Sequence, residues 1–255
     1  MHIVVLLKAV PIVGNERLDD GYRTQRTQLE ANGNDEYVLE KALKLTEAGG
    51  DVSLLTMGPA GATDALRKAL AMGATRAYHV QDDALAEACL RQTIDVLTAA
   101  VKKLEFDLLF CGADTSDGQG GVVAPALAAR LGLPYLSYAS EIEPGEGTVR
   151  VHRLSPTGYD VLEASTPALV MGTQVLGEPR YPSLRGIMQA RSKEVTTWSL
   201  ADLGIDPATV GEATVTTRVL GKEAPPQRSG ATILKGAPEE VVAQTVDFLA
   251  QRRLI

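Results

Sequence analysis

The chain is poor in aromatic residues, which make up only 4% of its 255 positions. Apolar residues still form 45% of the sequence, and alanine, valine, leucine and glycine are abundant. This composition suits layers of helices packed on a parallel sheet. Cysteine is scarce too, with only Cys89 and Cys111, and we expect both to be free thiols of a cytoplasmic protein rather than a disulfide.

An excess of positive charge and long apolar runs are also missing. The formal net charge is −7, whereas a nucleic-acid partner requires a basic face, so we expect no nucleic-acid binding. No apolar stretch approaches the ~20 residues that span a bilayer, so we expect no membrane insertion. The apolar run at residues 1–8 is too short for a signal peptide and lacks a cleavage site, which predicts a cytoplasmic location.

Motifs of hydrolytic and metal chemistry are absent as well. The sequence has no Gly-x-Ser-x-Gly, His-Glu-x-x-His or Cys-x-x-Cys motif. Its histidines, His2, His79 and His152, are scattered, and none lies beside a cysteine or carboxylate at a ligand spacing. We therefore predict no metal site and no catalytic residue, which favours a carrier or binding module over a hydrolase.

Short apolar runs alternate with helical patterns in the first half of the chain. We predict a polar loop at residues 14–33, strands at 3–10, 51–57, 76–80 and 106–111, and helices at 37–48, 63–72 and 84–104. Asn34, Asp35 and Glu36 are expected to cap the first of these helices. The alternation predicts a doubly wound, three-layer α/β fold with a mostly parallel, Rossmann-like sheet. Ligands of such sheets bind at the carboxyl ends of the strands.

The second half of the chain has a different character. Residues 141–153 predict a β-hairpin, which residues 159–163 can extend, and residues 168–171 predict one more strand. From residue 195 the sequence looks like a linker, and a final helix is expected at residues 238–252. We therefore expect an α/β domain at residues 1–195, with a small hairpin extension, and a C-terminal arm at residues 196–255.

Residues 111–132 join a predicted strand to a predicted helix through a glycine-rich loop. The first N–H groups of a helix have no partners within it, so a strand, a glycine loop and a helix N-terminus can form an anion site. Gly118, Gly120 and Gly121 let the backbone approach a ligand and adopt positive φ. We interpret the loop as a site for a nucleotide phosphate. The alternative is a loop that only turns the chain, because the sequence is neither a Walker A motif nor Gly-x-Gly-x-x-Gly.

Two acidic residues of this loop, Asp114 and Asp117, have several possible roles. They could hold a metal or a ribose hydroxyl, or they could cap the following helix.

A second informative stretch spans residues 177–193. Its prolines extend the backbone, and three apolar residues follow between arginines: Leu184, Ile187 and Met188. Apolar side chains beside arginines make a good docking surface for another protein. A buried helix with a charged rim is the other interpretation of the same pattern.

Two motifs are specific in combination, Arg-Lys-Ala-Leu-Ala-Met-Gly-Ala at residues 67–74 and Glu-Pro-Arg-Tyr at residues 178–181. Shorter motifs accompany them along nearly the whole chain: Lys8-Ala9-Val10-Pro11, Asn34-Asp35-Glu36-Tyr37, Gly58-Pro59, Asp117-Gly118, Ile187-Met188 and Pro225-Pro226-Gln227-Arg228. With these motifs the chain resembles the β subunit of electron transfer flavoproteins.

The resemblance implies a heterodimer with an α subunit that carries the redox FAD, whereas the β subunit holds a structural AMP. It implies that electrons come from dehydrogenases such as acyl-CoA dehydrogenases and leave to a quinone oxidoreductase. By position, the expected nucleotide-binding residues are Ala9, Asn32, Gly33, Asn34, Asp35, Met57, Gly112, Asp117, Gly118, Gln119, Gly120, Gly121, Val122 and Val123. The expected docking residues are Pro182, Leu184, Ile187 and Met188, with Leu184 as the apolar anchor.

Two departures from the family pattern leave alternatives open. Much of the family has Asp-Gly-Asp-Thr in the phosphate loop, whereas this chain has Asp-Gly-Gln-Gly at residues 117–120, so phosphate binding must depend more on backbone N–H groups. The docking stretch is also less basic than in relatives. A branch of the family binds a second FAD in place of AMP and bifurcates electrons. An adenine-nucleotide-binding α/β enzyme is a further alternative, but residues 8–11 do not supply the glycine loop that it requires.

Overall fold

A computed structural model describes residues 1–12, 14, 17–20, 23–221, 223 and 230–255. The described chain forms two units, Met1–Val219 and Leu220–Ile255. The first unit holds the sheet and most of the helices, and the second holds a single helix, α6 (Pro238–Gln251).

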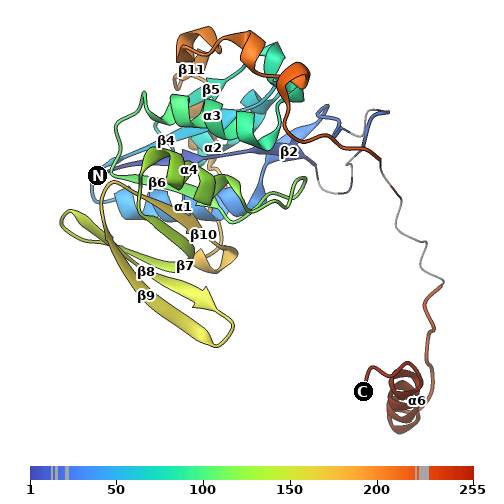
Figure 1. Ribbon diagram of the computed structural model, residues 1–255. Coiled ribbons are helices and arrows are strands. Elements are labelled where there is room, and N and C mark those ends of the chain that lie inside the picture. The colour runs from blue at the N-terminus through green and yellow to red at the C-terminus, as the bar shows by residue number, and fades with distance from the viewer. Residues whose placement is uncertain (13, 15–16, 21–22, 222, 224–229) are drawn as a thin grey trace. The chain divides into compact units, whose positions relative to one another are not determined.

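The centre of the first unit is a sheet of nine strands among the described residues (Figure 1). Across the sheet, their order is β11 (Val195–Trp198), β5 (Arg76–Val80), β4 (Asp51–Met57), β1 (His2–Leu6), β6 (Leu108–Gly112), β10 (Ala168–Gly172), β7 (Tyr135–Pro144), β8 (Thr148–Ser155) and β9 (Gly158–Ser165). The strands from β11 to β7 pair in parallel, whereas β8 and β9 pair antiparallel and form the predicted hairpin extension. The predicted mostly parallel sheet is confirmed.

Helices cover both faces of this sheet and make three layers. Helices α1 (Gly33–Thr46) and α2 (Ala62–Met72) pack on one face, and α3 (Leu90–Val101) and α4 (Val123–Leu131) pack on the other. Successive side chains of β1 alternate between the two cores: Ile3 and Val5 face α1 and α2, whereas Val4 and Leu6 face α3 and α4. This alternation confirms the doubly wound architecture.

The strand order reverses direction between β1 and β6. From β1 the chain proceeds through α1 to β4 on one side, and it returns through α3 to β6 on the other side of β1. The connections that follow β1 and β6 therefore diverge, and sheets of this kind bind their ligands at the carboxyl ends of such strands.

The predicted first strand, at residues 3–10, is divided in two. Leu7 still bonds to the carbonyl of Leu55, but the N–H of Lys8 turns to a carboxylate of α1. The chain then leaves the sheet as β2 (Ala9–Pro11), which pairs antiparallel with β3 (Leu29–Ala31). The predicted loop at 14–33 therefore contains a strand that its polar sequence did not indicate.

Two helix boundaries also differ from the prediction. Helix α1 begins at Gly33, so Asn34, Asp35 and Glu36 lie in its first turn instead of capping it. The predicted helix at 84–104 is a 3₁₀ turn, Asp83–Glu87, followed by α3, because Cys89 adopts an extended backbone and forms the N-cap of α3.

The predicted arm starts too early. Strand β11 pairs with β5, and Leu200 is buried in the core beside α3, so residues 196–219 belong to the first unit. The unit boundary lies between Val219 and Leu220 instead of at residue 195. The final helix is confirmed as α6, whereas the motif at 225–228 lies outside the described residues. In the described part of the chain, no helix has the length and apolar character needed to cross a bilayer.

Gly112, at the end of β6, is required by the close approach of α1. A Cβ atom at this position would lie 2.6 Å from Asp35 Oδ1 and 2.7 Å from the backbone of Asn34. A side chain would therefore push the start of α1 away from the sheet.

We expect Gly112→Ala to lower the free energy of unfolding by about 1–3 kcal/mol, the usual cost of forcing extra atoms into a packed site. Gly33→Ala is the matched control, since a Cβ there meets nothing within 4 Å. Urea unfolding followed by circular dichroism measures both variants. Equal stability of the two variants would contradict the packing role.

Candidate functional site

The first turn of α1 and the glycine-rich loop that precedes α4 meet at the carboxyl ends of β1 and β6. The carboxylate of Asp35 links these parts. Its Oδ2 accepts the N–H of Lys8 at 2.8 Å, and its Oδ1 accepts the N–H of Gly112 at 3.0 Å. One buried side chain thus holds the ends of β1 and β6 against the N-terminus of α1.

Burial raises the pKa of Asp35 from 3.8 to about 7, because the surroundings disfavour a charged carboxylate. The two backbone N–H groups and the nearby ammonium of Lys8 lower this pKa and oppose the effect of burial. Since the folded-state pKa lies above the unfolded value, folding favours the protonated carboxyl.

Two asparagines connect α1 to the loop. Asn32, the buried N-cap residue of α1, donates from Nδ2 to the carbonyl of Asp114 at 2.9 Å and accepts the N–H of Ser116 at 3.2 Å. Asn34 donates to the carboxylate of Asp114 at 2.7 Å. These bonds fix the loop against the helix. The carboxylate of Asp114 is therefore already hydrogen-bonded to a side chain of α1.

Asp117 is held by two cations. Its carboxylate accepts from Lys8 Nζ at 2.8 Å and from Arg26 Nη2 at 2.7 Å, and its side chain is only 3% exposed. Although burial raises the pKa of Asp117, its bonds with Lys8, Thr115 and Arg26 keep the pKa below its ordinary value. Asp117 therefore does not cap α4, whose N-cap, Val122, receives no side-chain bond.

The sequence did not indicate the roles of Lys8 and Arg26. Lys8 lies in a quoted motif, but no pattern predicts its partner 109 residues away. Arg26 belongs to the polar stretch before β3, and its other nitrogen, Nη1, donates to the carbonyl of Ala9 at 3.0 Å. Arg26 thus bridges Ala9 and Asp117, two of the residues that the resemblance assigns to the site.

The backbone of the loop divides into bonded and unbonded N–H groups. Those of Ser116, Gly118 and Gln119 donate within the site. The four N–H groups of residues 120–123 donate to no acceptor in the described chain. They lie at the start of α4, where the helix dipole favours an anion.

Glycine serves different purposes along this loop. Of the three glycines for which the sequence predicts positive φ, only Gly121 adopts it, and Gly118 and Gly120 do not. Gln119 also has a positive φ. A Cβ at Gly120 would meet nothing nearer than 4.0 Å, so the space beside it is open. Gly112, by contrast, has its N–H bonded to Asp35 and serves packing.

Most residues of the predicted nucleotide site lie together at this edge. They are Ala9, Asn32, Gly33, Asn34, Asp35, Gly112, Asp117, Gly118, Gln119, Gly120, Gly121, Val122 and Val123. Met57 ends β4, the neighbour of β1 on the other side, and its side chain packs against the core that faces α3.

His152 lies beside carboxylates, contrary to the prediction from spacing. Its strand β8 pairs with β7, so Nδ1 of His152 approaches Glu141 Oε2 at 3.0 Å, and its ring stacks on Tyr159. The ligand atoms of Glu141, Glu143 and His152 all lie within 4.8 Å of one another, at the surface of the hairpin extension. The contact between His152 and Glu141 and the ring stacking on Tyr159 account for this arrangement.

The predicted docking stretch forms a short helix, α5 (Leu184–Ala190), whose apolar residues face solvent. Leu184 is 83% exposed and Met188 72% exposed, and Ile187 is also exposed, whereas only Ala190 is buried. The interpretation as a buried helix is therefore wrong. An exposed group of large apolar side chains is typical of an interaction surface.

Helix α5 is fixed to α2 at several points. A Cβ at Gly186 would lie 2.3 Å from the carbonyl oxygen of Ala71, so the two helices touch through their backbones. Arg67 of α2 donates to the carbonyls of Ala190 and Lys193 at the end of α5, both at 2.7 Å. Lys193 in turn donates to the carbonyls of Leu70 and Ala74 at the end of α2. Each helix end is thus capped by a cation from the other segment.

Arg180 anchors the chain that leads into α5. Its backbone N–H and its Nε both donate to Glu40 Oε2, and its Nη2 reaches Glu47 at 2.8 Å. These bonds raise the pKa of Arg180, and despite burial they keep the pKa of Glu40 below its ordinary value. The next residue, Tyr181, is 96% exposed, beside the apolar face of α5.

The fold defines an α/β protein of the Rossmann-like, doubly wound class, with its candidate ligand site at the point where the strand order reverses. A family model described as "Electron transfer flavoprotein domain" matches residues 21–203. The chain belongs to the electron transfer flavoprotein family, on the branch of the β subunits.

Curated relatives match this chain over its whole length. "Electron transfer flavoprotein subunit beta" of Thermoanaerobacterium thermosaccharolyticum and that of Megasphaera elsdenii are each 35% identical, with 100% of both chains covered. "Caffeyl-CoA reductase-Etf complex subunit CarD" of Acetobacterium woodii is 32% identical, also over 100% of both chains. The family resemblance inferred from the motifs is confirmed.

The pKa of Asp35 predicts a pH dependence of stability. Its contribution is fully present below the unfolded pKa of 3.8 and is lost as the pH rises to about 7. Because asparagine does not titrate, we expect wild-type stability relative to Asp35→Asn to fall between these two pH values and then to level off. Urea unfolding of both proteins at a series of pH values measures this difference in the free energy of unfolding. A difference that stays constant with pH would contradict the raised pKa.

Proposed function

We propose that this chain is the β subunit of a heterodimeric electron transfer flavoprotein that receives electrons from dehydrogenases, such as acyl-CoA dehydrogenases, and passes them to a quinone oxidoreductase. In this proposal, the α subunit holds most of the redox FAD, and this chain binds a structural AMP and supports that FAD. The observation that carries the proposal is the unpaired start of α4, at residues 120–123, in the connection that follows β6 where the strand order reverses.

The residues present fit a nucleotide. The unbonded N–H groups at residues 120–123 suit a phosphate. The backbone at Ala9 and Met57 would contact the adenine, and residues 32–35 would close over the nucleoside. The chain therefore offers backbone donors for the phosphate end of a nucleotide.

The redox chemistry in this proposal belongs to the flavin, which accepts and releases electrons when it is bound. The residues of this chain position the groups around it. Asp35 keeps the ends of β1 and β6 and the start of α1 together, and Asp117 keeps the loop fixed between Lys8 and Arg26. A nucleotide bound there would tie these segments into one rigid edge.

Two surfaces of the chain support its proposed partners. The exposed apolar side chains of α5 would dock on a dehydrogenase, with Leu184 as the anchor. Helix α6 buries no residue within its own unit and exposes Val242 and Val246, which would lie on the α subunit. The pairing is consistent with relatives that are named as subunits.

A second FAD in the AMP pocket, as in the bifurcating branch of the family, remains the alternative. The relative named as part of a "Caffeyl-CoA reductase-Etf complex" covers the whole chain, and its name includes a reductase, whereas the names of the other two relatives give no partner. The nucleotide released from the protein decides between the two.

We expect the chain purified alone to be colourless and to release AMP when it is denatured, and we expect Gly120→Val to reduce this AMP several-fold. Valine would fill the open space beside the unbonded N–H groups. Gly230→Val is the control, because a Cβ there also meets nothing within 4 Å. Mass spectrometry of the released small molecules measures the content. A yellow chain that releases FAD would favour the bifurcating alternative, and absence of any nucleotide would overturn the proposed site.

We expect Leu184→Ala to weaken docking on the dehydrogenase by about 2 kcal/mol, or roughly thirtyfold in affinity, as for a truncated interface anchor. Its melting temperature should hardly change, because this side chain is 83% exposed. The measurement is electron transfer from a reduced acyl-CoA dehydrogenase to the α–β complex, with wild-type protein beside the variant. Normal transfer would show that α5 is not the docking site.

A further inference from the structure

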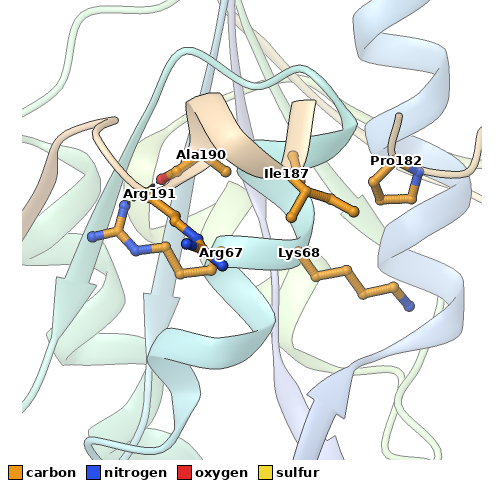
Figure 2. Close-up of a pocket in the computed structure, with 7 residues that line it drawn as sticks. Arg67, Lys68, Pro182, Ile187, Ala190 and Arg191 are labelled. Atoms are coloured by element: carbon orange, nitrogen blue, oxygen red, sulfur yellow. Dashed lines mark hydrogen bonds between the residues drawn. The ribbon is translucent and has the colours of Figure 1, made fainter. Parts of the chain in front are cut away.

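A groove of about 520 Å³ lies between α2 and α5, next to the docking face. Its floor is apolar, formed by Ala71, Ala190 and Ile187, and its edges carry Arg67, Lys68 and Arg191. In Figure 2 the two arginines lie at one end of the groove, and Lys68 and Pro182 lie at the other end. Ile187 lies between these two ends. Ile187 belongs both to the groove and to the exposed apolar face, so the two surfaces are continuous.

The charges of the groove are only partly balanced. Lys68 pairs with Glu36 at 2.6 Å, and Arg67 donates to two backbone carbonyls, which carry no formal charge. Arg191 is exposed and forms no ion pair with any residue that the structure describes. Three cations therefore face one carboxylate, in a chain whose net charge is −7.

A positive groove with an apolar floor fits a specific kind of occupant. A carboxylate can accept from the fork of a guanidinium, while the aliphatic part of the same side chain contacts isoleucine and alanine. A lone apolar side chain would leave the arginine charges unmatched. A phosphate would gain little from the apolar floor. An aspartate or glutamate on the docked protein satisfies both parts of the groove.

We propose that this groove, lined by Arg67, Lys68 and Arg191, receives an acidic side chain of the dehydrogenase that docks on α5. The inference rests on the proposed docking function, and it adds the chemistry of the partner surface: an apolar pocket for Leu184 with a carboxylate beside it. The groove then sets the orientation of the partner, because the apolar anchor and the carboxylate together fix two points of contact.

The groove is already formed in this chain, so the partner does not have to order it. Gly186 brings the backbone of α5 onto Ala71, and the two cation caps, Arg67 and Lys193, fix the ends of the two helices. A preformed site avoids the cost of immobilising side chains on binding. Arg191 follows directly on the buried Ala190 and is held near this fixed helix end.

Two arginines at the ends of the docking helix provide a matched test. Arg191, the C-cap residue, lines the groove, whereas Arg185, in the first turn, is exposed but does not line it. Changing either to glutamate alters the net charge equally, so long-range attraction changes by the same amount in both variants. Contact with a carboxylate in the groove is lost only in Arg191→Glu.

The experiment measures electron transfer from a reduced acyl-CoA dehydrogenase to the α–β complex in low and high salt. At about 0.01 M salt charges act over ~30 Å, whereas at about 1 M they act over only ~3 Å. We expect both variants to be slower at low salt, by about tenfold for Arg191→Glu. At high salt we expect Arg185→Glu to match the wild type and Arg191→Glu to stay several-fold slower. Melting temperatures should be equal.

Equal behaviour of the two variants at both salt concentrations would overturn the groove proposal and leave only general attraction between charges. Leu184→Ala, measured in the same assay, separates this failure from that of the docking function. If Leu184→Ala transfers electrons normally, the docking face itself is wrong. If it is slow while the two arginine variants behave alike, only the groove assignment fails.

Discussion

The buried carboxylate of Asp35 is the interaction on which the candidate site depends. It accepts the N–H of Lys8, two residues after the end of β1, and the N–H of Gly112, the last residue of β6. Without it, two backbone donors at the edge of the sheet would lack partners, and the start of α1 would lose its hydrogen bonds to the ends of both strands. An unsatisfied buried donor costs about 1–3 kcal/mol, so loss of these two hydrogen bonds would lower the free energy of unfolding. The absence of a side chain at Gly112 is what lets α1 come near enough to form it.

The charges beside this carboxylate explain how the loop keeps its shape. Asp117 is nearly inaccessible to water, and such a charge is tolerated only with partners, which Lys8 and Arg26 supply. Because Asp117 is bonded to Lys8 and Arg26, contacts within the protein fix the conformation of the loop. The N–H groups at residues 120–123 are the part that stays available. Shape and binding capacity are therefore provided by different residues of one loop.

The docking helix shows the same separation. Its contacts with the rest of the fold are made by Gly186, Ala190 and the caps from Arg67 and Lys193. Leu184 and Met188 stay exposed on this rigid support, whereas Ile187 also lines the groove beside α2. A seven-residue helix is too short to be stable by itself, so its order must come from these contacts. Rigidity of the support and apolar character of the surface together suit a docking element.

The sequence by itself determined the α/β class, most strands of the sheet, the hairpin extension, the last helix and the family. These follow from local periodicity, because a buried strand or an amphipathic helix carries its pattern in neighbouring residues. The motifs that identified the family are also local runs of sequence. Tertiary structure decided that the first strand breaks at Lys8, that residues 195–198 add a strand beside β5, and that Leu184 faces solvent. It also decided that Asp117 is bound by Lys8 and Arg26, 109 and 91 residues away. No local pattern contains these outcomes, because each depends on which distant group reaches the same place once the strands have paired.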